Sequence, residues 1–508
     1  MVAALTTSDD PRRWWKPHDL VGPFGGLCWL IVTVAANRNL LGSRIYEDGD
    51  FAANSILIDR ALDGRLLVGN YSRVGFHHPG PAILDAQAFG QALFHRILGV
   101  VPTPFNGQFL GVLLLNATCI GAAAAIVRRR LGSTAAALAL PAVVFVINRW
   151  EPWGLSSTWM PHTYIAPFLL LCVAAASVLT ASRHDLRYLA FSGGLLVHGH
   201  VSFVMFVGVT VLVAVATGIL LRRRGVSVEL LRREWIPWAW ASAVVVAFAL
   251  PVVLNLVYSW PGELERYANY AGDRQGFQQR SFGDVLRFLG HYWTRDAAAG
   301  AALIAFASGV AAGTAGWVVR RWRLPLAGIA VVVVLEAALV LLYAQRGVDN
   351  LGEPYIGLFA LSGPVLVLWS GSAGLLGLVE RVPELVWRRG LGALVVVACG
   401  ALTIATAAIA NPYRGFRGPE FVKGIGPGAV RLEFATPGWP WALGLVEQLR
   451  RRGREVCVLN PVWEILVTDE LICDSRSPGR LIVVYGPGET PPRDAVVYDD
   501  GAVVMVRG

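Results

Sequence analysis

Three carboxylates stand at the start of residues 46–81, the longest polar segment in the first half of the chain. They are Glu47, Asp48 and Asp50, in the order Glu-Asp-Gly-Asp. A carboxylate beside a membrane can serve as the general base that activates an acceptor hydroxyl, or as a ligand of a divalent metal. One of these acids could instead cap a following helix, because negative charge is favoured at a helix N-terminus. The residue types leave a catalytic, a metal-binding and a structural interpretation open.

Two histidines close the same segment, His77 and His78, and the sequence Pro-Gly-Pro follows them. Imidazoles can bind phosphate, bind a metal or relay protons. Neighbouring residues of an extended chain point in opposite directions, so we expect at most one of the two to face a site. A packed interfacial histidine is the structural alternative.

Two further candidates for substrate binding, Arg149 and His162, lie near the two ends of a loop that carries three tryptophans (residues 148–163). Tryptophans are expected where lipid meets water, so an aromatic belt with a local ion pair is the structural alternative. Arg346 follows a long apolar run. An arginine there could hold a lipid phosphate through two parallel hydrogen bonds, or could simply anchor a helix at the interface.

The polar and aromatic segment 259–296 supplies the remaining candidates, Arg266, Tyr270 and Arg274. Arginines among aromatic residues suit an anionic ligand that carries a sugar. A pair of solvated interfacial helices would show the same composition.

The composition indicates what must position these residues. Of the 508 residues, 55% are hydrophobic and 16% are charged, whereas soluble domains carry roughly 25% charged residues. Apolar runs long enough to cross a hydrocarbon core of ~30 Å recur along the chain, which predicts a polytopic α-helical membrane protein. A membrane barrel would show short alternating segments instead. The net charge of +9 comes mostly from arginines between the apolar runs, which is an orientation signal and not a nucleic-acid patch.

We expect about eleven membrane spans. They lie near residues 21–36, 108–127, 135–147, 164–181, 188–198, 201–221, 235–258, 298–319, 324–344, 355–379 and 391–409. A cytoplasmic N-terminus puts every arginine cluster between spans on the cytoplasmic side, as the positive-inside rule requires. These clusters lie at residues 128–130, 183–187, 222–224, 320–323 and 381–389. The topology predicts a multi-pass protein of the plasma membrane.

The same topology places segments 37–105 and 259–296 and the C-terminal region outside the cell. Within segment 37–105, helical spacing predicts two interfacial helices, at residues 50–62 and 81–98. The predicted domains are therefore a membrane domain, residues 1–410, and an extracytoplasmic domain, residues 411–508.

The C-terminal domain is expected to be a small α/β domain of about 100 residues. Short strands are predicted at residues 456–459, 481–485, 495–498 and 502–506, and an amphipathic helix at residues 441–451. Outside the cytoplasm, Cys457 and Cys473 become a candidate disulfide. The cysteines within apolar runs are expected to be small core residues.

The order of parts in EDGDFAANSILIDRALDGRLLVGNYSRVGFHHPGPAIL resembles the first external loop of the GT-C membrane glycosyltransferases. The resemblance is to the protein mannosyltransferase and aminoarabinose transferase branch, in which an acidic pair opens the loop and a Lys-or-His-Pro-Pro-Leu element closes it. Here the acids are spread apart, so the base could be Asp48 or Asp50. His77 and His78 replace the usual lysine.

The resemblance implies an inverting transfer of a sugar from a polyprenyl-phosphate donor to an envelope glycan or lipid on the outer face. Arg346 and His78 would hold the donor phosphate, and residues of segment 259–296 would line the groove. A divalent metal, Mg²⁺ or Mn²⁺, could assist, with Asp48, Asp50 and His78 as its ligands. The arginine-rich, lysine-poor composition is typical of a GC-rich genome such as an actinobacterium's, for which arabinofuranose or mannose would suit cell-wall biogenesis.

Two other functions stay open. A flippase or transporter of lipid-linked glycans would favour inverted repeats and charges at mid-membrane, and Glu336 is the clear charge within a predicted span. A non-catalytic assembly partner that binds glycan would tolerate loss of the acids.

Overall fold

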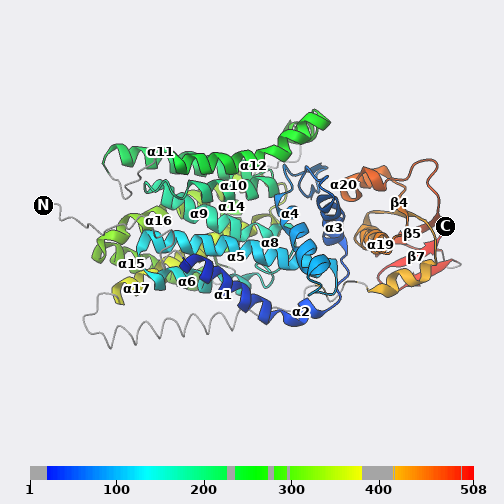
Figure 1. Ribbon diagram of the computed structural model, residues 1–508, viewed down its shortest axis with the longest axis horizontal. Helices are drawn as coiled ribbons and strands as arrows, with labels where there is room; N and C mark the ends of the chain where they lie inside the picture. Colours follow the sequence, from blue (N-terminus) through cyan, green and yellow to red (C-terminus); the bar gives the residue numbers. More distant parts are fainter. Residues whose placement is uncertain are drawn as a thin grey trace.

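The computed structural model describes residues 20–225, 235–272, 280–294, 298–379, 413, 416, 418–492 and 495–508. Long helices lie side by side in a bundle, and a small sheet with its own helix lies beyond one end of this bundle (Figure 1). The first long polar segment lies between the two parts.

The bundle is built from apolar helices. They are α1 (Val21–Ala36), α5 (Pro104–Leu131), α6 (Thr134–Val144), α9 (Ile165–Leu179), α10 (Leu186–Gly199), α11 (Phe203–Arg223), α12 (Ile236–Ser259), α15 (Ala298–Val318), α16 (Arg323–Arg346) and α17 (Ser362–Val379). Short helices join them: α2 (Arg38–Gly42), α7 (Ile147–Trp150), α8 (Met160–Thr163) and the 3-10 helices η4 (Arg320–Trp322) and η5 (Pro354–Leu361).

Seven helical segments in the described part of the chain are long and apolar enough to cross a membrane. Helix α9 is buried on all sides, whereas the side chains of α12 are largely exposed and apolar, as lipid-facing side chains are. The predicted membrane class therefore stands. The expected spans at 21–36, 135–147 and 188–198 correspond to helices shorter than a full crossing, and the span at 391–409 lies outside the described residues.

Three of the arginine clusters meet at one end of the bundle, and the cluster at 381–389 lies outside the described residues. Arg129 pairs with Asp185, Arg130 donates to the carbonyl of Thr180 (2.9 Å), and the indole of Trp322 donates to the carbonyl of Leu131 (2.8 Å). The predicted clusters at 128–130, 183–187 and 320–323 thus share a side, as the positive-inside rule requires. Which face of a membrane this side occupies stays a prediction.

The opposite end carries the polar segment. It forms α3 (Gly49–Leu62), a hairpin of β1 (Tyr71–Ser72) and β2 (Phe76–His77), then α4 (Ala82–Gly90), which continues as a π-helical segment, η2 (Gln91–Ile97). The helices predicted at 50–62 and 81–98 are present. Glycines let α4 lie against α5, since a methyl group on Gly90 would come within 2.4 Å of the carbonyl oxygen of Gly107. Two amphipathic helices, α13 (Glu263–Gly272) and α14 (Phe282–Thr294), lie at the same end.

The C-terminal region forms a five-stranded sheet in the order β4-β3-β5-β7-β6. Its strands are β3 (Val430–Phe434), β4 (Val456–Val458), β5 (Arg480–Tyr485), β6 (Val496–Asp499) and β7 (Val504–Arg507). Strand β3 is parallel to β4 and β5, and β7 is antiparallel to β5 and β6. Helix α19 (Trp439–Arg451) packs on the sheet. The short helical turn η6 (Pro419–Ile425) precedes the first strand, and further turns lie between the strands: η7 (Thr436–Gly438), η8 (Pro461–Trp463), α20 (Glu464–Val467) and η9 (Asp469–Leu471).

The predicted strands and helix of this region are all present, and Cys457 and Cys473 form a disulfide. Strand β3 was missed by the sequence analysis. The domain division at residue 410 falls outside the described residues and stays a prediction.

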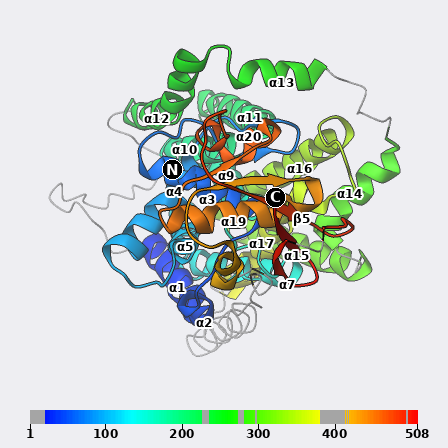
Figure 2. The same cartoon turned by 90° about the vertical axis from the view of Figure 1, so that its right-hand side faces the viewer.

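Helix α3 belongs to two cores at once. Its residues Ala52, Ala53 and Ile56 share a buried cluster with the sheet and α19, whereas Leu57 and Ile58 join the core of the bundle. Figure 2 shows α19 and the sheet in front of α3 and the bundle. The C-terminal region is therefore seated directly on the helix that begins with the acidic cluster.

Candidate functional site

Asp50 lies in the first turn of α3, and both oxygens of its carboxylate are held. The hydroxyl of Tyr71 donates to Oδ1, and the indole N–H of Trp159 donates to Oδ2 at 2.7 Å. Each carboxylate oxygen can accept two hydrogen bonds, so the group keeps acceptor capacity for a ligand hydroxyl. Asp50 is half-buried, which leaves it accessible. The arrangement is an oriented carboxylate that can still receive a proton.

Tyr71 remains a hydrogen-bond donor because its hydroxyl stays protonated. Burial raises the pKa of Tyr71 far above its usual value, and the negative charge of Asp50 raises it further. Both effects disfavour a phenolate beside the carboxylate.

An arginine lies near Asp50 across an aromatic wall. The ring centroids of Trp159 and Tyr355 are 5.2 Å apart, and the guanidinium of Arg73 donates to the hydroxyl of Tyr355 at 3.0 Å. Arg73 also pairs with Asp349 and is exposed, so it can approach a further anion. Arg73 was not among the residues predicted from the sequence, although an arginine in the turn of the hairpin, inside the acidic segment, was the available signal.

A cavity of about 560 Å³ adjoins this cluster through Asp349. Its lining residues come from α14 and the residue Arg280 before it, and from the loop that leads into η5, namely Arg280, Asp284, Arg287, Phe288, His291, Tyr292, Asp349, Asn350, Leu351, Gly352 and Pro354. Arg280 is fixed by the carbonyls of Ala344 and Asp349. Volumes of this size are typical of small-ligand sites, and the lining offers charged and aromatic groups of segment 259–296.

The two histidines point to different partners, as alternation predicts. The backbone N–H of His77 donates to Glu263 at 2.8 Å, and its ring Nδ1 lies 3.5 Å from the same carboxylate. The ring of His78 is buried against that of His200, with centroids 4.1 Å apart, and its Nδ1 accepts from the N–H of Val201. Burial lowers the pKa of His78, and the neighbouring histidines lower it further, so this ring is neutral. Among the described residues no hydrogen bond joins His78 to Asp50.

The other two acids of the cluster face the C-terminal region. Glu47 is 1% exposed and accepts from the guanidinium of Arg451 and from the hydroxyl of Ser55 (2.6 Å). Asp48 precedes the first turn of α3, and its carboxylate lies against Gly444 of α19. The three neighbouring acids therefore occupy three different environments.

His162 lies behind the aromatic wall. Its ring is buried, edge-on to that of Trp159 with centroids 5.2 Å apart, and its Nε2 is 3.4 Å from the carboxylate of Glu151. Arg149 is exposed on α7. His162 thus contacts the tryptophan that holds Asp50, whereas no hydrogen bond or ion pair within the described part of the chain connects Arg149 to this cluster.

The candidates from later segments are spread more widely. Arg266 is exposed and pairs with Glu263 at 3.2 Å, and Tyr270 lies edge-on to Phe76 with centroids 5.7 Å apart. Arg346 is exposed at the C-terminal end of α16. Arg274 lies outside the described residues.

The candidate metal ligands do not converge. Asp48 lies against α19, Asp50 is held by Tyr71 and Trp159, and His78 stacks on His200. In the part of the chain that the structure describes, no three His, Cys, Asp or Glu side chains gather as a ligand set. These residues do not fit the predicted Mg²⁺ or Mn²⁺ site.

No model of a known protein family matches the chain, and no curated protein matches it. Among solved structures, the chain is similar to the oligosaccharyltransferase of Archaeoglobus fulgidus in its apo form. The identity is 11%, the match covers 94% of this chain and 70% of that chain, and the TM-score is 0.37. A TM-score below 0.5 does not establish a shared fold.

Proposed function

We propose that this protein is an integral-membrane glycosyltransferase with Asp50 as its catalytic base. It transfers a sugar, with inversion, from a polyprenyl-phosphate donor to an envelope glycan or lipid on the outer face. The observation that carries the proposal is the carboxylate of Asp50, which is oriented by Tyr71 and Trp159 and lies near the exposed guanidinium of Arg73. The resemblance of segment 47–84 to the first loop of membrane glycosyltransferases supports it.

The reaction needs one proton acceptor and one group that stabilises an anion. The acceptor hydroxyl gives its proton to Asp50 while its oxygen forms a bond to the anomeric carbon of the sugar. The bond from that carbon to the phosphate oxygen breaks, and the lipid phosphate leaves with the electron pair. A guanidinium stabilises the leaving phosphate through paired hydrogen bonds.

Arg73 fits the role of stabilising the leaving phosphate better than the predicted Arg346. It is connected to the Asp50 cluster through Tyr355 and Trp159, and Asp349 links it to the cavity beside α14. We assign the donor phosphate to Arg73 and the sugar to this cavity. Arabinofuranose and mannose remain the candidate sugars.

The test uses the purified full-length protein with radiolabelled polyprenyl-phosphate sugars and envelope acceptors. Asp50→Asn should reduce transfer by about 100-fold or more, because it removes the general base but keeps the shape of the side chain. Asp48→Asn serves as the matched variant, since that carboxylate lies against α19, and it should retain more activity. Normal transfer by Asp50→Asn would refute the assignment.

A transporter is the second candidate. Glu336 is buried within α16 and accepts from the hydroxyl of Thr210 on α11 at 2.6 Å, and transporters use carboxylates at this depth. Failure to transfer sugar from any lipid donor, together with movement of labelled lipid across vesicles, would favour this function. A protein that only binds glycan would neither transfer sugar nor move labelled lipid across vesicles.

A further inference from the structure

Helix α19 of the C-terminal region lies along the acidic cluster. A methyl group on Gly49 would be 3.5 Å from Cβ of Pro440, and one on Gly444 would be 2.1 Å from Oδ1 of Asp48. One face of α19 thus follows the start of α3, because residues four apart on a helix share a face. Gly444 is required at this contact, since any side chain there would displace the carboxylate.

The far end of the same face holds Glu47. The guanidinium of Arg451 donates to both oxygens of this carboxylate, and the Nη1–Oε2 distance is 2.9 Å. The Nε of Arg451 also lies 2.8 Å from Glu447 on its own helix. Burial raises the pKa of Glu447, although the positive charge of Arg451 opposes this. The arginine is therefore the cation that two buried carboxylates share.

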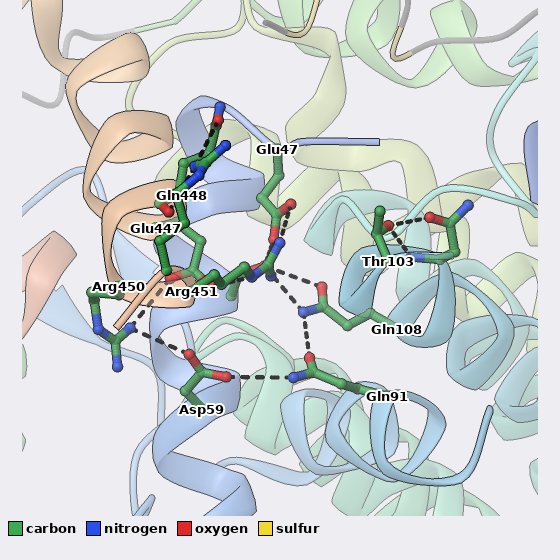
Figure 3. Close-up of polar contacts among 12 residues, drawn as sticks. Glu47, Asp59, Gln91, Thr103, Gln108, Glu447, Gln448, Arg450 and Arg451 are labelled. Atoms are coloured by element: carbon green, nitrogen blue, oxygen red, sulfur yellow. Dashed lines mark hydrogen bonds and ion pairs between the residues drawn. The ribbon is translucent and has the colours of Figure 1, made fainter. Parts of the chain in front are cut away.

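The contacts continue into a closed ring of polar side chains (Figure 3). From Glu47 the ring passes through Ser55, Gln108, Gln91 and Asp59 to Arg450, and returns through Glu447 and Arg451. Its members come from the start of α3, from α3 itself, from α5, η2 and α19. A ring of this kind fixes the rotation of α3 about its axis, because each partner is satisfied in only one arrangement.

Asp50 lies on the first turn of the helix that the ring holds. Without Arg451, Glu47 would be a buried charge without its cation, and such a group moves toward water if it can. The start of α3 would move with it, and the carboxylate of Asp50 would leave the donors on Tyr71 and Trp159. A displacement of about 1 Å at a catalytic group can cost about 100-fold in rate.

We infer that Arg451 is a positioning residue of the transfer reaction, and that the C-terminal region completes the catalytic loop by holding Glu47 and α3. This inference rests on the proposed function of Asp50. The C-terminal region then acts on the chemistry from outside the site, and need not touch the substrate.

The experiment compares two neighbouring arginines in the full-length protein. Arg451→Ala should lower kcat by about 100-fold and leave the KM for the lipid donor unchanged. Arg452→Ala is the control, because Arg452 is exposed and contacts Gln448 of its own helix. Arg451→Lys should recover part of kcat, since an ammonium group pairs with Glu47 but cannot form both parallel bonds. Gly444→Ala, which introduces only a methyl group, should lower kcat in the same way.

Hydrogen–deuterium exchange provides a readout that does not depend on activity. Peptides covering residues 46–62 should exchange faster in Arg451→Ala and Gly444→Ala, while peptides of α9 exchange as in the unmodified protein. Unchanged exchange at 46–62, or equal effects of Arg451→Ala and Arg452→Ala, would overturn the inference. If the unmodified protein transfers no sugar from any donor, the proposed function fails, and the exchange data alone decide whether Arg451 orders the loop.

Discussion

Asp50 differs from its acidic neighbours in what surrounds it. Glu47 faces a guanidinium and Asp48 faces a glycine, whereas Asp50 faces a phenol and an indole. Neutral donors orient a carboxylate without neutralising its charge, and so keep it able to accept a proton. An ion pair such as that of Glu47 holds structure together instead.

Arg73 should determine affinity for the lipid donor. Removing a hydrogen bond to a charged group costs about 1.5–3 kcal/mol, so Arg73→Ala should raise the KM for the donor by about 10- to 100-fold. Arg73→Lys should give an intermediate KM, because an ammonium group cannot bind phosphate through a planar fork. Steady-state kinetics against donor concentration measure this effect.

Arg346→Ala is the matched variant for this prediction, since Arg346 is exposed at the end of α16. It should leave the KM for the donor near that of the unmodified protein. A larger effect of Arg346→Ala than of Arg73→Ala would show that Arg346, and not Arg73, binds the donor phosphate.

The sequence revealed the acids but not their partners. A Glu-Asp-Gly-Asp cluster before a helical pattern is visible in the residue types, and it identified Asp50 and Asp48 as candidates. Arg73 contacts Tyr355 and Asp349, which lie 282 and 276 residues further along the chain. Such pairings depend on how the helices pack, and no local pattern encodes them.

At the scale of elements, α13 is fastened to the hairpin that ends in His77. Glu263 accepts from the backbone N–H of His77, and the hydroxyl of Tyr267 donates to the carbonyl of His77 at 2.5 Å. Partial burial raises the pKa of Glu263, but the hydrogen bonds from His77 and the charge of Arg266 outweigh it and hold that pKa below its usual value. The ionised carboxylate of Glu263 is therefore the form that binds the hairpin at His77.

Lowering the pH should therefore detach α13 from the hairpin at His77. A carboxyl group whose pKa is depressed on folding contributes stability above its unfolded pKa of about 4.3, and this is lost as the pH falls through the folded value. Exchange of peptides from Glu263–Gly272, corrected for the intrinsic rate at each pH, should be slow above about pH 4.3 and faster below it. Glu263→Gln should exchange fast throughout.

Glu265→Gln is the control for this prediction, because Glu265 is exposed two residues along the same helix. It should reproduce the pH dependence of the unmodified protein. An equal loss of pH dependence in both variants would show that the helix is released by a different group.

Elements with a clear period were predictable. The 3.6-residue spacing of apolar side chains located α3 and α19, and short continuous apolar runs located β5 and β7. The missed strand β3 has the alternating burial of a half-buried strand, but Arg431 and Glu433 interrupt its apolar residues, so it shows no continuous apolar run. The role of α3 in two cores was not predictable, since each face of one helix serves a different partner.

At the scale of the whole molecule, the C-terminal region is stabilised by a covalent link. The disulfide between Cys457 and Cys473 closes a loop of 16 residues, and a loop of that length contributes about 3 kcal/mol in the chain-entropy account. Cys457→Ser together with Cys473→Ser should lower the stability of the sheet by about this amount. Urea unfolding of the full-length protein, followed by exchange in peptides of β3–β5, measures it.

Cys28→Ser is the control, because Cys28 is a free, half-buried thiol of α1. In the Cys28→Ser variant the sheet should unfold at the same urea concentration as in the unmodified protein. An unchanged midpoint in the double variant would mean that the sheet draws its stability from α3 and not from the disulfide.

The contact between Glu47 and Arg451 spans 404 residues of chain. A ribosome adds about 5–20 residues each second, so on the order of half a minute separates the synthesis of α3 from that of its partner helix. During that interval Asp50 is already made but its helix is not yet held. On the proposed mechanism, a chain whose synthesis stops before α19 is inactive, and activity begins only when the last segment has folded against the first loop.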